Sequence, residues 1–331
     1  MRAVEIQSPG VTKLVEKPDP VPGPGEVVLA IGACGICGTD LRVLEGDYGH
    51  VEYPLVPGHE FAGHVVAVGA GVTKLREGDL AAADPNLSCY HCEWCDRGAV
   101  NLCANWVALG VTTDGAMAEM VVVPERFAVK LPDGMDVGVG ALIEPLSCVL
   151  HAVERADLVG DRRLLIYGGG AIGLMFLAVA KLKGLHVSVI EPHALRREVA
   201  VSLGADAVAG SSAELDLGDG LDYVLDASGA PAAITDGITH LRKRGTYLQM
   251  GVAPSAARIS ISPYELYANE WRFIGSNSLE RCYPEAAELM PELADKLATL
   301  ITHRVPLAEF DQAVALMTSP DALKVHVIPT L

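Results

Sequence analysis

The sequence predicts a two-domain α/β protein, in which a β-rich domain precedes a doubly wound parallel sheet. Its first third consists of short β-rich stretches that Gly and Pro residues separate. Near residue 150 the pattern changes to alternating strand-like and helix-like stretches, which is typical of βαβ units. A chain of 331 residues is long enough for two domains that each bury their own core.

The strands expected in the first domain are short and separated by turns such as Pro22-Gly23-Pro24-Gly25. We expect them at Val27–Ile31, Ala62–Val68, Leu80–Ala82 and Met120–Val123. This texture indicates a small barrel or a rolled sheet.

The second domain is expected to alternate strands with helices. The strands are predicted at Leu164–Tyr167, His186–Ile190, Tyr223–Asp226, Thr246–Met250 and Arg272–Gly275, and the first two helices at Ile172–Lys183 and Ala194–Leu203. After Pro284, two helical stretches and a last strand, Val325–Ile328, carry no dinucleotide motif. We therefore expect a first domain at 1–146, completed by 277–331, and a dinucleotide-binding domain at 147–276.

The net charge of −17 argues against nucleic acid and anionic membranes as partners, because such a surface repels phosphate. Met1–Leu14 has no apolar segment typical of a secretory signal, and the apolar run Leu164–Ala180 is short for a bilayer span. We therefore expect a cytoplasmic protein, in which clustered cysteines indicate metal binding before disulfides.

Four cysteines occur with the spacing C-x2-C-x2-C-x7-C: Cys89, Cys92, Cys95 and Cys103. Such short steps let one loop present four thiolates to a tetrahedral zinc ion, which leaves no position for substrate. We expect a structural zinc site. A nucleic-acid-binding zinc module would need a basic face, whereas Asp84, Glu93 and Asp96 surround this loop with only Arg97 opposing them.

A second group of candidate ligands comes from three separate segments. Cys37 lies in Gly35-Ile36-Cys37-Gly38-Thr39-Asp40, His59 and Glu60 lie in Pro57-Gly58-His59-Glu60, and Glu144 precedes Pro145. A thiolate, an imidazole and a carboxylate would hold a catalytic zinc and leave one exchangeable position. Each residue alone has an ordinary structural explanation, such as a buried thiol, a core histidine or a surface acid.

These motifs, with a glycine-rich motif farther along, follow one another in an order that resembles the zinc-containing medium-chain alcohol and polyol dehydrogenases over nearly the whole chain. The resemblance implies a GroES-like catalytic domain beside a Rossmann domain, with catalytic zinc on Cys37 and His59 and with Glu60 or Glu144 completing the site. Glu144-Pro145 stands where liver-type alcohol dehydrogenases have cysteine, and it looks like the sorbitol, threonine and sugar dehydrogenase branch.

Thr39 follows Cys37 by two residues and is expected to accept the proton of the substrate alcohol, whose hydride then passes to nicotinamide. Many relatives have a relay histidine three residues later, but this chain has Arg42. A guanidinium does not deprotonate in proteins, so Arg42 cannot relay a proton. Either the cofactor ribose and water carry it, or another group does, and Arg42 could equally contact cofactor phosphates.

The dinucleotide motif directly follows the strand expected at Leu164–Tyr167. Its residues are Gly168, Gly170, Ala171, Ile172 and Gly173, and the glycines match G-x-G-x-x-G, which binds a pyrophosphate at a helix N-terminus. Glu191 ends the next strand, where an acid binds the adenosine ribose and favours NAD. Arg196 and Arg197 follow closely and could accept a 2′-phosphate, so NADP stays open, although both could simply be solvated.

The sequence says least about the identity of the substrate. Tyr48 and Asn277 are candidate contacts for substrate hydroxyls, which suits a polyol, sugar alcohol or cyclitol. Three interpretations remain: a polyol-type secondary-alcohol dehydrogenase, a threonine-type dehydrogenase or carbonyl reductase, and a non-catalytic zinc- and dinucleotide-binding protein. A non-catalytic protein would not need the catalytic candidates together, and this chain has all of them: Cys37, Thr39, His59, Glu60 and Glu144. We expect a homo-oligomer, a tetramer or a dimer.

Overall fold

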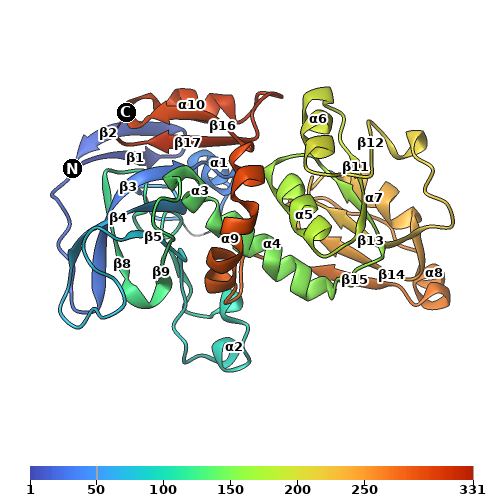
Figure 1. The fold of residues 1–331 in the computed structure, drawn as a ribbon, viewed down its shortest axis with the longest axis horizontal. Helices are drawn as coiled ribbons and strands as arrows, with labels where there is room; N and C mark the ends of the chain where they lie inside the picture. Colours follow the sequence, from blue (N-terminus) through green and yellow to red (C-terminus); the bar gives the residue numbers. More distant parts are fainter. Residues whose placement is uncertain (50, 331) are drawn as a thin grey trace. The chain divides into compact units, whose positions relative to one another are not determined.

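The computed structural model describes residues 1–49 and 51–330 of the chain. It forms two compact units: Met1–Ser147 with Glu280–Leu331, and Cys148–Leu279. The boundary between them falls within one helix, α4 (Ile143–Ala156), whose first turn belongs to the first unit. Each unit is built around its own sheet (Figure 1).

The first unit contains a seven-stranded sheet in the order β16-β17-β3-β4-β5-β9, with β8 also paired to β3. Its strands are β3 (Glu26–Gly35), β4 (Glu60–Val68), β5 (Leu80–Ala83), β8 (Met120–Pro124), β9 (Ala128–Lys130), β16 (Ile301–Pro306) and β17 (Lys324–Ile328). The two C-terminal strands pair parallel to each other, and β17 pairs antiparallel to β3. The end of the chain therefore completes the sheet that the beginning starts.

The core of this unit is formed by inward-facing residues of β3, β4 and β17, including Ile31, Phe61 and Val325, which are almost completely buried. β3 reads as a nearly continuous apolar run because the side chains on both of its faces are largely buried. Helix α3 (Val137–Ala141) packs against β3 and β4, and the Asp136 carboxylate caps it by accepting from Val139 N at 3.1 Å.

The second unit is a six-stranded parallel sheet in the order β12-β11-β10-β13-β14-β15. Its strands are β10 (Arg163–Tyr167), β11 (His186–Ile190), β12 (Ala207–Ala209), β13 (Leu221–Asp226), β14 (Leu241–Gln249) and β15 (Arg272–Gly275), and its helices are α5 (Ala171–Leu182), α6 (Ala194–Ser202), α7 (Pro231–Thr239) and α8 (Pro263–Asn269). β10 lies between β11 and β13, so the strand order reverses there, which is the position where such sheets bind ligands.

The expected strands are all present with end shifts of a few residues, and the fold class is confirmed. The structure adds elements that the sequence pattern did not single out: the hairpin β1 (Arg2–Ser8)–β2 (Val11–Glu16), helices α4, α7 and α8, and strands β12 and β16. The first unit also contains α9 (Tyr283–Ala298) and α10 (Phe310–Leu316). Among the described residues, none of the helices is long and apolar enough to cross a membrane.

Candidate active site and metal centres

Cys37 stands at the N-terminus of α1 (Gly38–Glu45), two residues after β3 ends at Gly35. It is the N-cap residue, and the Asp40 carboxylate accepts a hydrogen bond from Cys37 N at 2.8 Å. This capping box fixes the direction in which the chain enters the helix. Cys37 therefore lies at the positive end of the helix dipole of α1.

Asp40 also joins the Cys37 segment to the His59 segment. Its other carboxylate oxygen accepts from Gly58 N at 3.2 Å and lies 3.4 Å from His59 Nδ1. Burial opposes a charge on His59, but the neighbouring Asp40 carboxylate outweighs it and raises the pKa of His59 well above its ordinary value. Asp40 is therefore a positioning residue for both segments, and it was overlooked in the sequence although it lies within the Cys37 motif.

The register of the sheet brings Glu60 beside Cys37. Glu60 is the first residue of β4 and pairs directly with Gly35 of β3. A Cβ atom on Gly35 would lie only 2.4 Å from Glu60 Oε2, so a side chain at this position would displace the Glu60 carboxylate. Glu60 is buried, and both its oxygens contact Lys324 Nζ, at 2.6 and 2.9 Å.

Donor atoms of Cys37, His59 and Glu60 all lie within 4.8 Å of one another. These three residues are called the Cys37 group below. A thiolate, an imidazole and a carboxylate are the donor set of a catalytic zinc with an open position, so the residues fit the ion. Glu144 is buried in the first turn of α4 and is not part of this close group, although its charge acts on Lys324.

Three further candidates lie on or near α1. Thr39 occupies its first turn and Arg42 its last, and both are half-buried. Tyr48 is half-buried against the cluster that includes Val43. Burial raises the pKa of Tyr48, and the charges of His59, Cys37 and Arg42 also act on it, so Tyr48 lies near the Cys37 group.

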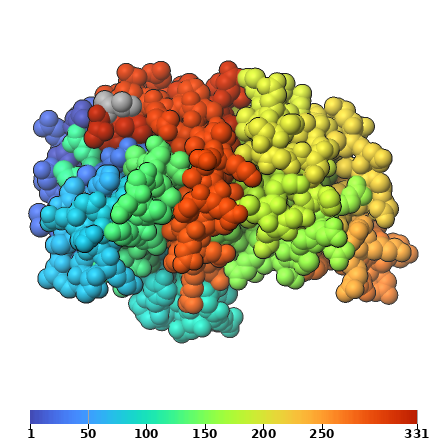
Figure 2. All heavy atoms as spheres, in the orientation of Figure 1, coloured from blue at the N-terminus to red at the C-terminus, as the bar shows by residue number. Residues whose placement is uncertain are grey.

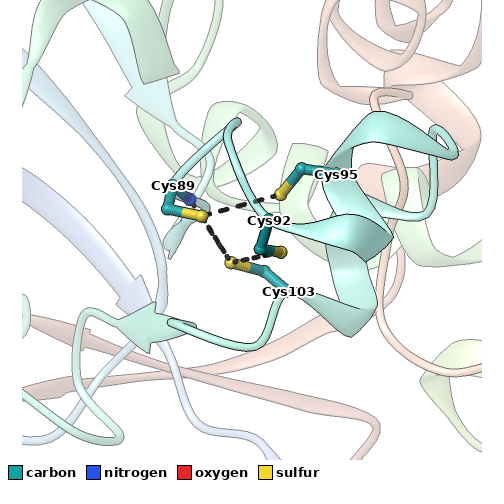
Figure 3. Close-up of side chains that lie close together, drawn as sticks. All are labelled: Cys89, Cys92, Cys95 and Cys103. Atoms are coloured by element: carbon teal, nitrogen blue, oxygen red, sulfur yellow. Dashed lines mark hydrogen bonds between the residues drawn. The ribbon is translucent and has the colours of Figure 1, made fainter.

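The four loop cysteines converge. Figure 3 shows their sulfur atoms pointing toward one another from a loop that contains α2 (Glu93–Asp96). The Sγ–Sγ distances are 3.4 Å for Cys89–Cys103, 3.9 Å for Cys92–Cys103 and 4.0 Å for Cys89–Cys95. Four sulfurs about 2.3 Å from a central zinc would be about 3.8 Å apart in a tetrahedron, so the group fits zinc.

Hydrogen-bond donors lower the pKa of Cys89 and Cys92, whereas burial raises the pKa of Cys95 to about 11. Cys103 Sγ accepts from Cys89 N at 3.4 Å, and Cys92 Sγ accepts from Ala104 N at 3.4 Å. Hydrogen bonds from the backbone of His91 and from the Asn105 side chain lower the pKa of Cys89 to about 6. Such outer hydrogen bonds orient thiolate ligands and stabilise their charge.

The glycine-rich turn after β10 shows a distinct reason for each glycine. Gly168 has φ +105°, a conformation that L side chains rarely adopt. A Cβ on Gly173 would lie 1.9 Å from the Gly168 carbonyl oxygen, so helix and turn pack too closely for any side chain. Gly170, the N-cap of α5, faces open space, which leaves the backbone N–H groups of the helix N-terminus accessible to a phosphate.

Glu191 lies at the carboxyl end of β11 and is buried against this turn. Its Oε2 accepts from Gly169 N at 2.7 Å, and its Oε1 accepts from His193 N at 2.9 Å. Arg197 donates to the carbonyl oxygens of Glu191 and Pro192, both at 2.7 Å, so its guanidinium is held by the backbone. Arg196 is half-buried, and Asn277 is exposed two residues beyond β15.

Comparison with known proteins identifies the class. Residues 23–133 match the family model of the alcohol dehydrogenase GroES-like domain, and residues 171–294 match that of the zinc-binding dehydrogenases. The chain is 35% identical to a D-altritol 5-dehydrogenase of Agrobacterium fabrum, with 93% of this chain and 94% of the relative covered. It is 34% identical to an L-threonine 3-dehydrogenase of Symbiobacterium thermophilum, with 98% and 95% covered. The chain belongs to the zinc-containing medium-chain alcohol dehydrogenase family.

Solved structures agree with this assignment. A zinc-binding-dehydrogenase-type protein from Sinorhizobium meliloti bound to NADP superposes with a TM-score of 0.92 at 32% identity, covering 99% of both chains. An alcohol dehydrogenase from E. coli in complex with NADH superposes with a TM-score of 0.91 at 28% identity, also covering 99% of both. The protein is an oxidoreductase of this family, with a GroES-like and a Rossmann domain.

Proposed function

We propose that this protein is an NAD-dependent polyol dehydrogenase that oxidises a secondary alcohol to the ketone. The observation that carries the proposal is the convergence of Cys37, His59 and Glu60 within 4.8 Å. Relatives support the substrate class: besides the altritol enzyme, a sorbitol dehydrogenase of Halalkalibacterium halodurans is 33% identical, with 95% of this chain and 94% of the relative covered.

Cys37 and His59 would hold a catalytic zinc, with Glu60 or Glu144 as the carboxylate, and the four loop cysteines would hold a structural zinc. When bound in the Cys37 group, zinc supplies Lewis acidity that lowers the pKa of the substrate hydroxyl. Thr39, in the first turn of α1, would accept the hydroxyl proton. Tyr48, near the same group, would contact a further hydroxyl of a polyol, and Asn277, exposed beyond β15, would contact another.

The proton cannot continue through Arg42, because a guanidinium keeps its proton. The proposed path therefore leads from Thr39 to the cofactor ribose and water. Arg42, half-buried at the end of α1, would bind a cofactor phosphate instead.

NAD is favoured over NADP because Glu191, at the carboxyl end of β11, would bind the adenosine ribose through its carboxylate and repel a 2′-phosphate. The glycine turn with Ala171 and Ile172 would hold the pyrophosphate. Arg197 is engaged by backbone carbonyl oxygens, so Arg196 is the residue that would accept a 2′-phosphate if NADP were used.

The proposal is tested by following nicotinamide reduction with a panel of altritol, sorbitol, arabinitol, cyclitols, threonine and simple alcohols, with NAD and NADP in parallel. Chelator-sensitive turnover of a polyol with NAD is expected. Cys37→Ser should abolish this turnover while leaving most of the free energy of unfolding intact, since it exchanges one atom at a half-buried helix start. Persisting turnover in Cys37→Ser would reject the assigned metal site.

A threonine-type amino alcohol is the second candidate, because L-threonine 3-dehydrogenases are 33–34% identical over nearly the same length. The same panel separates the two classes. A preference for threonine over every polyol would replace the leading proposal.

We further propose a homo-oligomer, a dimer or a tetramer, that buries the surface around α8. Tyr264 is 75% exposed, Tyr267 82% and Val252 69%, and β15 is an edge strand of the sheet. Figure 2 shows α8, in orange, at the periphery of the second unit. Sedimentation should report an assembly that Tyr267→Ser weakens; a monomer would reject it. The expected cytoplasmic location stays a prediction for cell fractionation.

A further inference from the structure

One tryptophan side chain packs against two separate hydrophobic clusters of the first unit. Trp106 contacts the small cluster beside the loop cysteines, whose buried residues are Cys95, Val100 and Cys103. It also contacts a second cluster, called the Val43 cluster below, whose buried residues are Ile6, Val43, Leu55, Ala108 and Val111. Tyr48 packs against the same Val43 cluster. Trp106 therefore joins the four-cysteine loop to the part of the first unit that carries Tyr48.

Hydrogen bonds fix the position of the Trp106 ring. Its Nε1 donates to Asn86 Oδ1 at 2.8 Å, and its backbone N donates to the Cys103 carbonyl oxygen at 3.2 Å. Asn86 is itself buried, and its backbone N and its Nδ2 donate to Asp84 Oδ1 at 2.8 and 3.1 Å. A buried indole that has such a partner for its N–H keeps one orientation. The ring is thus anchored on both clusters.

The backbone that follows this tryptophan reaches the segment before His59. Cβ atoms on Gly110 and on Gly115 would each lie 2.3 Å from the Gly58 carbonyl oxygen, so a side chain at either position would displace backbone. Ala116 N donates to the same oxygen at 2.9 Å. Gly58 directly precedes His59. The segment that leaves the four-cysteine loop therefore contacts the backbone that positions one member of the Cys37 group.

The four-cysteine loop has little core of its own. Its cluster contains three buried residues, and two of them are cysteines. A segment with so small a core depends on a bound metal for its order, because apolar burial alone does not offset the entropy of ordering it. Removal of the metal should therefore loosen the loop. Trp106 would then lose the surface against which one side of its ring packs, and the Val43 cluster would lose part of its cover.

We propose that Trp106 is a positioning residue that couples the metal occupancy of the four-cysteine loop to the binding of substrate beside Tyr48. An ordered loop holds the ring against the Val43 cluster, and this cluster in turn supports Tyr48. Because such coupling is reciprocal, a ligand that orders the surroundings of Tyr48 must also raise the metal affinity of the loop by the same factor. The inference rests on the proposed function, since it takes the surroundings of Tyr48 as the place where a polyol binds.

The test measures the zinc affinity of the full-length protein by competition with a chromophoric chelator. The loop site is the one that Cys92→Ser loses. The affinity is compared without ligand and with NADH plus the polyol that the panel identifies, a pair that cannot react with each other. Trp106→Ala removes the ring, and Trp106→Phe keeps an aromatic ring. Trp94→Ala is the matched control, because Trp94 lies on the same loop but is 40% exposed and stacks on Arg97.

In the native protein, NADH plus polyol should raise the zinc affinity of the loop site about fivefold or more. Trp106→Ala should lose most of this increase, and its KM for the polyol should rise while NADH affinity stays native. Trp106→Phe and Trp94→Ala should keep most of the increase. A purely structural role of Trp106 would instead lower the zinc affinity equally with and without ligands.

An equal increase in native and Trp106→Ala protein, or a loop site in the native protein that does not respond to the ligands, would overturn the inference. If Trp106→Ala does not fold, Trp106→Leu provides the same comparison with a smaller apolar side chain. A native protein that turns over none of the polyols would instead reject the proposed function.

Discussion

Adding one methyl group at each of two glycines of the dinucleotide turn should have opposite consequences. Gly170 has φ −75° and ψ 178°, which alanine adopts freely, and a Cβ there meets no atom within 4 Å. Gly170→Ala should therefore cost less than about 1 kcal/mol of unfolding free energy, the usual loss at an N-cap. The methyl group would, however, occupy the space through which the pyrophosphate approaches the helix, so NADH affinity should fall about tenfold or more.

Gly173→Ala places its methyl group inside the protein instead, 1.9 Å from the Gly168 carbonyl oxygen. Alanine gains about 1 kcal/mol in helix propensity over glycine. Relieving a contact with backbone that close costs more, about 3 kcal/mol, as for overpacked cores. The steric effect wins, and Gly173→Ala should lose about 2 kcal/mol of unfolding free energy.

Urea unfolding followed by circular dichroism and NADH titration followed by fluorescence separate the two effects. Gly184→Ala is an unsuitable control because Gly184 has φ +77°, whereas Gly275 combines open space with no positive φ, so Gly275→Ala should change neither quantity. Native NADH affinity in Gly170→Ala, or native stability in Gly173→Ala, would contradict these expectations.

Three further predictions concern other parts of the molecule. Cys92→Ser should reduce the zinc content and lower the melting temperature, because the four-cysteine loop loses a ligand; an unchanged melting curve and zinc content would contradict the structural site. Glu191→Ala should weaken NAD binding more than NADP binding, as isothermal titration can measure, and equal losses would mean that Glu191 does not contact the ribose. Burial lowers the pKa of His326 to about 3, so the unfolded chain binds the proton first. The neutral His326 contributes fully to the free energy of unfolding above about pH 6.5, and this contribution should fall by about 1.4 kcal/mol per pH unit toward pH 3. Urea unfolding at several pH values should show this slope in the native protein, and His326→Leu should lack it.

Much of the site could be predicted from the sequence because its chemistry is local. The four loop cysteines lie within 15 positions, from Cys89 to Cys103, so one short loop brings them together. The glycine turn is equally local: each glycine acts on the strand end and the helix start that immediately adjoin it. The periodicity of apolar residues likewise predicts the alternating strands and helices around this turn. It also predicts the end of β11, where Glu191 lies.

Only the tertiary structure decided which distant residues meet. Lys324 carries no motif and reaches Glu60 through the pairing of β17 with β3, a register that a local pattern does not encode. For the same reason the sequence could not rank Glu60 against Glu144, whereas the structure puts Glu60 in the close group and Glu144 outside it. Local backbone geometry depends on neighbouring residues, so motifs reveal it. The charge balance of a buried site depends on strand register over the whole chain, so it appears only in the folded protein.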